Sequence, residues 1–197
     1  MAVRNLVVFA GCLFLTQGIA QAEPRNIEIC AACHGVDGSG VGYDYVPIIA
    51  GTPASHLEEA LFAYKDGARN CVGVPVMCDT ITPLSDDEII EMAEHYAAMP
   101  RLSSDEEFDP QLAAVGKIIH DDLCAQCHVL PTDKNVDSAL GIPLHGQKSS
   151  YLRLSLGAYM TGDRETLVPI MDDKLRELDQ DKIDALLHYY ASWDPQS

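Results

Sequence analysis

The sequence contains the pattern Cys-x-x-Cys-His twice, and this repeated pattern constrains the chain more than any other feature. The two runs are Cys30–His34 and Cys124–His128. Two thiols one helical turn apart can each form a thioether with a haem vinyl group, and the adjacent histidine can bind the iron as its proximal ligand. Zinc binding or thiol redox chemistry would not require the histidine in both copies. The sequence therefore predicts two covalently attached haems. The residues predicted to hold them are Cys30, Cys33 and His34 for the first haem, and Cys124, Cys127 and His128 for the second.

The two motifs belong to a duplicated unit. Cys30 corresponds to Cys124 and Pro75 to Pro169, both at an offset of 94 residues. So steady an offset indicates duplication of a whole folding unit. Strand signals are nearly absent, so we predict an all-α fold of two tandem haem domains. The predicted boundaries are residues 23–99 for the N-terminal domain, 100–110 for an acidic, exposed linker with proline at both ends, and 111–197 for the C-terminal domain.

Helix signals recur at matching places in both halves. Apolar periodicity predicts helices over Pro53–Gly67, with Thr52 as N-cap, and over Ser149–Gly162. The last helix of the first half begins with the capping box Ser85–Glu88. Its predicted buried stripe is Ile89, Ile90, Ala93 and Tyr96. The counterpart in the second half begins at Asp179, with Ile183, Leu186, Leu187 and Tyr190 buried. Each half is small, so we expect the haem to provide much of the apolar filling.

A methionine is the expected sixth iron ligand, because Met raises the reduction potential relative to a second His. Met77 and Met171 occupy equivalent places, each 43 residues after its haem histidine and in a proline-containing loop. Met92 and Met160 lie in predicted helices, where methionine is usually packing material. We therefore predict Met77 and Met171 as the axial ligands.

The remaining histidines have no matched pair across the repeat, and we predict surface or packing roles for them. They are His56, His95, His120, His145 and His188. His145 stands apart because it lies in the loop expected to face the haem pocket. In the same loops, the carbonyls of Pro47 and Pro143 are predicted acceptors for the proximal imidazole N–H groups.

Two further cysteines, Cys71 and Cys78, flank Met77 and have no counterpart in the second half. In an oxidising compartment, we expect a disulfide that closes this short loop and restrains Met77. The alternative is a soft copper site made of Cys and Met side chains. A haem-bound Met77 could not also serve that site.

The first 22 residues have the features of a secretory signal peptide. Arg4 precedes an apolar run over residues 6–15, and Ala20–Ala22 forms a small-residue cleavage site. The run is too short to span a membrane, and a lipid anchor on Cys12 is the weaker alternative because the apolar run continues beyond it. No later segment is apolar for long enough to cross a bilayer. We therefore predict a protein of the periplasm without a membrane span.

The chain is strongly acidic, with a formal net charge of −17 at pH 7. This charge disfavours binding to nucleic acid and to anionic lipid, and it favours basic partners through electrostatic steering. An acidic surface that only keeps the protein soluble is an equal alternative.

With these residues in view, the mature chain resembles the tandem dihaem c-type cytochromes, which include cytochrome c4 and the cytochrome subunit of flavocytochrome c sulfide dehydrogenase. In the first half, the resemblance rests on Cys-Ala-Ala-Cys-His-Gly, Ile49–Gly51, Tyr64–Arg69 and Leu84–Glu88. The second half is more similar to the sulfide dehydrogenase subunit. The runs that favour this subunit are Gly116–Asp121, Met171–Leu178 and Ala185–Ser192.

The resemblance implies two tandem class I cytochrome c domains, each enclosing one covalently bound haem. It also implies a non-catalytic subunit that accepts electrons from a flavoprotein sulfide dehydrogenase and passes them to a small periplasmic acceptor. The chain has no Gly-x-Gly-x-x-Gly after a strand, so FAD would belong to the partner alone. One alternative is a free-standing dihaem carrier that donates to a terminal oxidase. Another is a haem enzyme with an open iron site, which paired methionine ligands disfavour.

Overall fold

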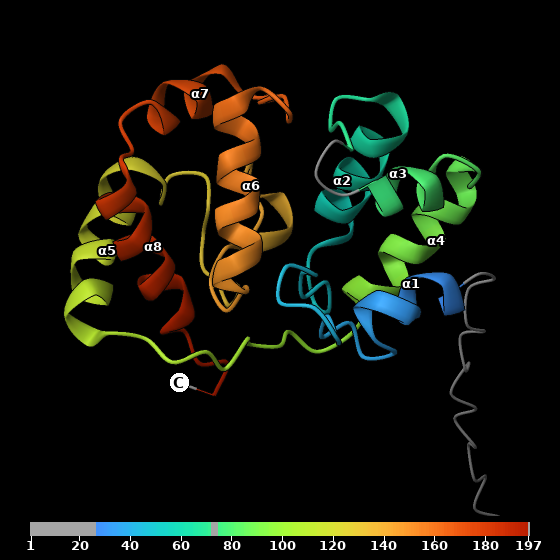
Figure 1. Ribbon diagram of the computed structural model, residues 1–197. Coiled ribbons are helices and arrows are strands. Elements are labelled where there is room, and N and C mark those ends of the chain that lie inside the picture. Colours follow the sequence, from blue (N-terminus) through green and yellow to red (C-terminus); the bar gives the residue numbers. More distant parts are fainter. Residues whose placement is uncertain (1–26, 72–74, 197) are drawn as a thin grey trace, which may run out of the picture.

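The computed structural model describes residues 27–71 and 75–196 (Figure 1). The predicted signal peptide, residues 1–22, and the alternative anchor Cys12 lie outside the described residues. Within the described ranges the regular structure is helical, and an isolated antiparallel bridge joins Arg69 to Arg164. The predicted all-α fold class is confirmed. In the same ranges, no helix is both long enough and apolar enough to span a membrane.

Over the described residues, each half contains four α-helices in the same order. The N-terminal half contains α1 (Ile27–His34), α2 (Ala54–Asp66), α3 (Pro75–Ile81) and α4 (Asp86–Ala97). The C-terminal half contains α5 (Pro110–Leu123), the 3-10 turn η1 (Val136–Ser138), α6 (Ser149–Thr161), α7 (Pro169–Leu175) and α8 (Gln180–Ala191). The two halves lie side by side in Figure 1, with α2 and α6 on their facing sides. This arrangement is what a duplicated folding unit predicts.

The last helix of each half begins with the predicted cap. At α4, the Ser85 hydroxyl accepts from the Glu88 N–H, and the Glu88 carboxylate accepts from the Ser85 N–H at 2.9 Å. At α8, the Asp179 carboxylate accepts from the Lys182 N–H at 2.9 Å. Each cap satisfies a backbone donor that the first helical turn leaves without a partner.

The four residues predicted to be buried on α8 are buried. On α4, three of the four predicted residues are buried, and Ile90 is the exception. Ile90 is half-buried, and Met92 takes its place in the core at 2% exposure. Met92 lies three residues after Ile89 and one before Ala93, so it shares their helix face.

Two local expectations are wrong. Thr52 is not the cap of α2, because Pro53 occupies the N-cap position without a side-chain hydrogen bond. The buried Thr52 hydroxyl instead accepts from Arg101 Nη1 at 2.8 Å.

The segments around Met77 and Met171 are the short helices α3 and α7 rather than loops. Each begins at a proline, whose fixed φ suits the first helical position.

In the C-terminal half, α5 crosses α8 at very short range. A Cβ atom built on Gly116 would lie 2.0 Å from the Ala185 carbonyl oxygen, so only glycine fits at this position. The α8 side chains on the inner face form the core of this half together with Leu152 of α6. In the N-terminal half, Leu57 of α2 packs on Ala93 and Tyr96 of α4.

The first part of the segment that connects α4 to α5 is docked, whereas most of its second part is exposed as predicted. Residues 101–104 are half-buried, and Asp105 and residues 107–110 are exposed. Arg101 Nη2 donates to the His145 carbonyl at 3.2 Å, and the Ser104 N–H donates to the Gly146 carbonyl at 2.8 Å. Hydrogen bonds to both halves hold residues 101–104 in place, so the expectation of an exposed linker is wrong for these residues.

The two halves also contact each other directly through buried polar groups. Gln147 bonds both backbone groups of Ile48, since its Oε1 accepts from the N–H at 2.9 Å and its Nε2 donates to the carbonyl at 2.7 Å. Lys148 Nζ donates to the Gly40 carbonyl. Together with the Arg69–Arg164 bridge, these bonds tie the two halves together in a defined orientation.

We expect Gly116→Ala to lower the free energy of unfolding by about 1–3 kcal/mol, because the added methyl group has no space between α5 and α8. Chemical denaturation of the holoprotein measures this loss. Gly157→Ala in α6 is the matched control, since a Cβ there has no neighbour within 4 Å. That variant should be unchanged or more stable, by up to about 1 kcal/mol, because alanine favours the helix. Equal stability of the two variants would contradict the close crossing.

Candidate haem sites

Both Cys-x-x-Cys-His motifs bring their side chains to one face of a helical turn. Cys30 and Cys33 lie in α1, and His34 is its last residue. The second motif follows α5 as a turn in which the Cys124 carbonyl accepts from the N–H groups of Cys127, at 3.1 Å, and His128, at 2.9 Å. Because a helical turn takes 3.6 residues, the first, fourth and fifth positions of each motif lie on the same side. All four cysteines carry free, half-buried thiols.

A backbone carbonyl orients the histidine of each motif. His34 Nδ1 lies 3.2 Å from the Pro47 carbonyl oxygen, as predicted. His128 Nδ1 lies 2.8 Å from the carbonyl oxygen of Ile142, so the prediction of Pro143 is wrong by one residue. The two acceptors Pro47 and Ile142 are 95 residues apart, whereas Pro47 and Pro143 are 96 apart, so the two prolines do not occupy equivalent positions. In both halves, Nδ1 is occupied and Nε2 is left as the metal-binding nitrogen.

The protonation state of these histidines also fits iron binding. Burial lowers the pKa of His34 and of His128, and the bond to the carbonyl only partly opposes this effect. Neutral imidazole is the form that binds a metal. Burial likewise raises the pKa of the Cys30 and Cys124 thiols, which disfavours the reactive thiolate needed for thiol redox chemistry.

The pocket around His128 is shaped to the imidazole ring. A Cβ on Gly141 would lie 2.6 Å from His128 Nδ1 and 2.7 Å from Cε1, so a side chain there would displace the ring. The Gly141 N–H also donates to the Cys127 carbonyl at 3.1 Å, which ties the loop to the motif. Each half thus offers two thiols and one oriented, neutral imidazole. This donor set fits a c-type haem.

The predicted axial methionines occupy equivalent positions in the two halves. Met77, in α3, packs against the cluster of Ile81, Leu84 and Ile89. Met171, in α7, is half-buried, and its N–H donates to the Val168 carbonyl at 2.9 Å. Their role as iron ligands stays a prediction.

Cys71 and Cys78 form a disulfide, with their Cα atoms 6.1 Å apart. Met77 therefore lies next to one end of a covalently closed loop, of which residues 72–74 lie outside the described part of the chain. With both sulfur atoms in the disulfide, the thiolates that a copper site would need are absent. The second half has no cysteines at the equivalent places.

Three of the unmatched histidines are buried packing residues. The His120 and His145 rings pack edge to face, 5.0 Å apart, and Tyr189 and Tyr190 lie against both. Burial lowers the pKa of His120 to about 4 and of His145 to about 3. His56 is also buried, at 8% exposure, and its Nε2 has no hydrogen-bond partner among residues 27–71 and 75–196.

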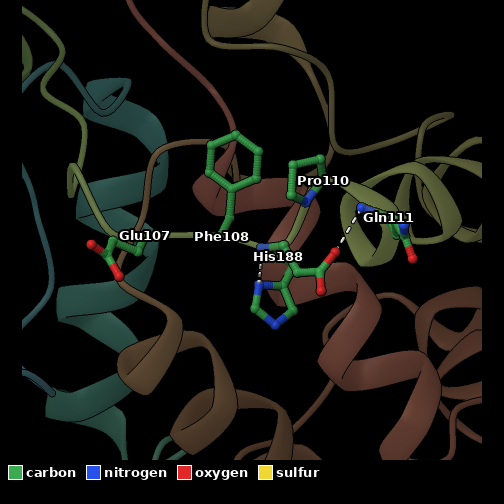
Figure 2. Close-up of a pocket in the computed structure, with 6 residues that line it drawn as sticks. Glu107, Phe108, Pro110, Gln111 and His188 are labelled. Carbon is green, nitrogen blue, oxygen red and sulfur yellow. Dashed lines mark hydrogen bonds between the residues drawn. The ribbon is translucent and has the colours of Figure 1, made fainter.

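His188 lies near the surface and accepts a hydrogen bond from the Asp109 N–H, with Nδ1 and N 3.1 Å apart. Figure 2 shows it in an open depression at the start of α5, together with Glu107, Phe108, Pro110 and Gln111. None of the predicted haem residues lines this depression. We therefore do not regard it as the functional site.

Three features were not predicted from the sequence: the Ile142 carbonyl as acceptor, Gly141 against the His128 ring, and the contact of Arg69 with the other half. The sequence does contain a signal for Arg69, because Gly-x-Arg recurs at Gly67–Arg69 and Gly162–Arg164 with an offset of 95 residues. The Ile142 carbonyl has no signal of its own, because any residue has a backbone carbonyl.

Comparisons with known proteins agree with this geometry. No family model matches the chain. It is 30% identical over 187 residues to the thiosulfate dehydrogenase electron acceptor of Stutzerimonas stutzeri, covering 90% of this chain and 83% of the relative. It is also 30% identical over 156 residues to cytochrome c4 of Pseudomonas aeruginosa, covering 75% and 74%.

Two solved structures are similar in fold. Cytochrome c4 of Acidithiobacillus ferrooxidans has a TM-score of 0.72 at 25% identity, covering 84% of this chain and 99% of the other. Thiosulfate dehydrogenase of Marichromatium purpuratum has a TM-score of 0.66 at 27% identity, covering 85% of this chain and 36% of the other. The chain thus belongs to the dihaem c-type cytochromes related to cytochrome c4, electron-transfer proteins with two tandem class I cytochrome c folds and two covalently bound haem c groups.

Proposed function

We propose that this protein accepts electrons from a periplasmic thiosulfate dehydrogenase and passes them to a small electron acceptor. The observation that carries this proposal is the similarity, over 90% of the chain, to a protein named as a thiosulfate dehydrogenase electron acceptor. The structural similarity to part of a thiosulfate dehydrogenase chain supports it.

The donor that the sequence first suggested is different, namely a flavoprotein sulfide dehydrogenase. The second-half runs Gly116–Asp121 and Met171–Leu178 favour that donor. A free-standing carrier is favoured by the similarity to cytochrome c4. All three functions use the same electron-transfer chemistry, so they differ only in the partner.

In this proposal Cys30 and Cys33 hold one haem, and Cys124 and Cys127 hold the other. When bound, each haem supplies a one-electron iron couple. His34 and His128 would bind the two irons through Nε2, since their Nδ1 atoms are engaged by carbonyls. Met77 and Met171 would provide the second protein ligand of each iron. With two protein ligands on each iron, no position would be open to substrate, so the chain would be non-catalytic and the chemistry on sulfur would belong to the partner.

The contacts between the halves serve this function by holding the two sites at a constant separation. The Gln147–Ile48 bonds and the docked segment around Arg101 cross from one half to the other. We propose residues 23–99 and 111–197 as the two haem domains, with the docked segment between them.

The periplasm is the compartment that we propose, because residues 1–22 read as a secretory signal and the Cys71–Cys78 disulfide needs an oxidising environment. The net charge of −17 would speed encounters with partners that carry a basic docking surface.

We expect Met77→Leu and Met171→Leu each to remove about half of the far-red methionine-to-iron charge-transfer absorption of the oxidised protein, because each deletes one of two sulfur ligands. Leucine keeps a similar volume, so folding should persist. Met160→Leu is the matched control, since Met160 is 45% exposed on α6. If either ligand variant kept the whole absorption, that methionine would not be a ligand.

The partner is tested by purifying the native protein under mild conditions and following haem reduction by visible absorption. We expect a thiosulfate-oxidising enzyme to co-purify or to reduce the haems when thiosulfate is supplied. Reduction by sulfide together with a flavin-bearing chain would identify the flavoprotein donor instead. A lone protein inert to both, yet oxidised by a terminal oxidase, would identify a free carrier and contradict the proposal.

A further inference from the structure

Arg69 places a positive charge inside the contact between the two halves. Its side chain is 8% exposed, although it directly follows the end of α2 at Gly67. The backbone is held from both sides, because the Arg69 N–H donates to the Ala63 carbonyl at 2.9 Å and Arg69 pairs with Arg164 of the other half. The neighbouring Glu165 N–H donates to the Ala68 carbonyl at 2.9 Å. The position of this arginine is therefore determined by both halves.

The guanidinium group of Arg69 has neutral neighbours. Nη2 donates to the Tyr151 hydroxyl at 3.0 Å, and the group lies over the Tyr64 ring, 4.6 Å from its centroid. Among the described residues, no carboxylate lies within ion-pair distance of it. The carboxylate of Asp163, beside the Arg69–Arg164 bridge, is occupied by Asn70 and Thr161.

Five basic residues in the described part of the chain form ion pairs, namely Lys65, Lys117, Arg153, Lys174 and Arg176, whereas Arg69 and Arg101 do not. Of the 197 residues, 30 are acidic and only 13 are Lys or Arg. Exposed arginines do find partners, such as Arg153 with Asp184 at 2.6 Å, where both side chains are about half exposed. Burying a guanidinium without an anion lowers the stability of the folded state, because the charge loses its hydration and gains no counter-charge. The charge of Arg69 therefore calls for an anion that the polypeptide does not provide.

The uncompensated charge acts on Tyr151. Burial opposes ionisation of its hydroxyl, but Arg69, Arg164 and the hydrogen bonds from Ser155 and Arg69 outweigh burial and lower its pKa to about 7. A phenol with so low a pKa indicates a local excess of positive charge.

Arg69 is connected to both candidate haem sites through its two tyrosine neighbours. Tyr64, under its guanidinium, packs in the same cluster as Met77, the proposed ligand of the first haem. Tyr151 packs on the core of the second half, which includes Tyr190. Tyr190 in turn makes a hydrogen bond with Cys124, one of the proposed attachment residues of the second haem.

We propose that Arg69 is a positioning residue that provides the counter-charge for a haem propionate carboxylate at the contact between the halves, and that it raises the reduction potential of that haem. The proposal rests on the two haem sites of the proposed function. A carboxylate suits the planar fork of a guanidinium, which can donate two parallel hydrogen bonds. A buried cation close to a redox centre favours the reduced state, because that state carries one positive charge fewer.

The experiment is a spectroelectrochemical titration of the dihaem protein with Arg69→Gln, Arg69→Lys and the control Arg153→Gln. We expect Arg69→Gln to shift at least one of the two midpoint potentials downward, and Arg69→Lys to restore most of the shift. Arg153→Gln should leave both potentials unchanged, because its charge is exposed and screened. Potentials in Arg69→Gln equal to those of the control would overturn the proposal.

Haem content and the methionine absorption are measured on the same samples, so that loss of a haem is distinguished from loss of the counter-charge. Two haems per chain with a lowered potential support the role of Arg69, whereas fewer than two in the wild-type protein would contradict the haem sites themselves.

A second readout covers the case in which Arg69→Gln does not fold. Arg69→Lys keeps the positive charge but loses the planar fork that donates two parallel hydrogen bonds to a carboxylate. The resonance Raman bands of the propionates should therefore shift in Arg69→Lys and stay as in the wild type in Arg153→Gln. Unchanged propionate bands in Arg69→Lys would overturn the proposal.

Discussion

The hydrogen bond from each proximal imidazole to a backbone carbonyl is the interaction on which the rest of the structure depends. The bonds from His34 to Pro47 and from His128 to Ile142 select the tautomer and leave Nε2 as the nitrogen that can bind a metal. They also tie each Cys-x-x-Cys-His motif to a loop that would otherwise be independent of it. The same loops lead directly to the contact between the halves, at Ile48 and at Gln147. The orientation of the haem ligands and the docking of the two halves are thus connected through a few residues of backbone.

The contact between the halves is held largely by polar groups. Gln147 bonds both backbone groups of Ile48, Arg101 bridges from Thr52 to the His145 carbonyl, and Arg69 reaches Tyr151. Directional bonds define one relative orientation, whereas an apolar surface alone tolerates sliding. A constant orientation is what electron exchange between two fixed centres requires. Each buried arginine has a cost, and the haem carboxylates are the groups best suited to offset the cost of Arg69.

The two halves are copies, but they are not equivalent. The first has the Cys71–Cys78 disulfide next to Met77, its proposed axial ligand, and the second has a buried cluster of His120, His145, Tyr189 and Tyr190. A covalent restraint in one half and a packed aromatic cluster in the other would offer different surroundings to the two haems. With the proposed ligands the same in both halves, such differences would separate the two reduction potentials.

The sequence by itself determined the features that depend on residue type and spacing. These are the two haem motifs, the duplication, the all-α fold, and the caps at Ser85 and Asp179. Each is a local pattern, because helix periodicity and capping act over a few residues. The matched positions of Met77 and Met171 were visible for the same reason. In the segment after Met99, composition correctly indicated the exposure of Asp105 and of residues 107–110, but it did not indicate that residues 101–104 are docked.

Only the tertiary structure decided what depends on backbone groups and on residues far apart in the chain. The acceptor of His128 is Ile142 because a carbonyl, not a side chain, provides it, and a shift of one residue in the loop changes its identity. Gly116 is required because α8 comes within 2.0 Å of its missing Cβ, although it looks like an ordinary weak point in a helix. Although the chain has 30 acidic residues, none of those in its described part forms an ion pair with Arg69, which is buried where the second half packs on it. A sequence records which charges are present, whereas the packing of the two halves decides which of them is left without a partner.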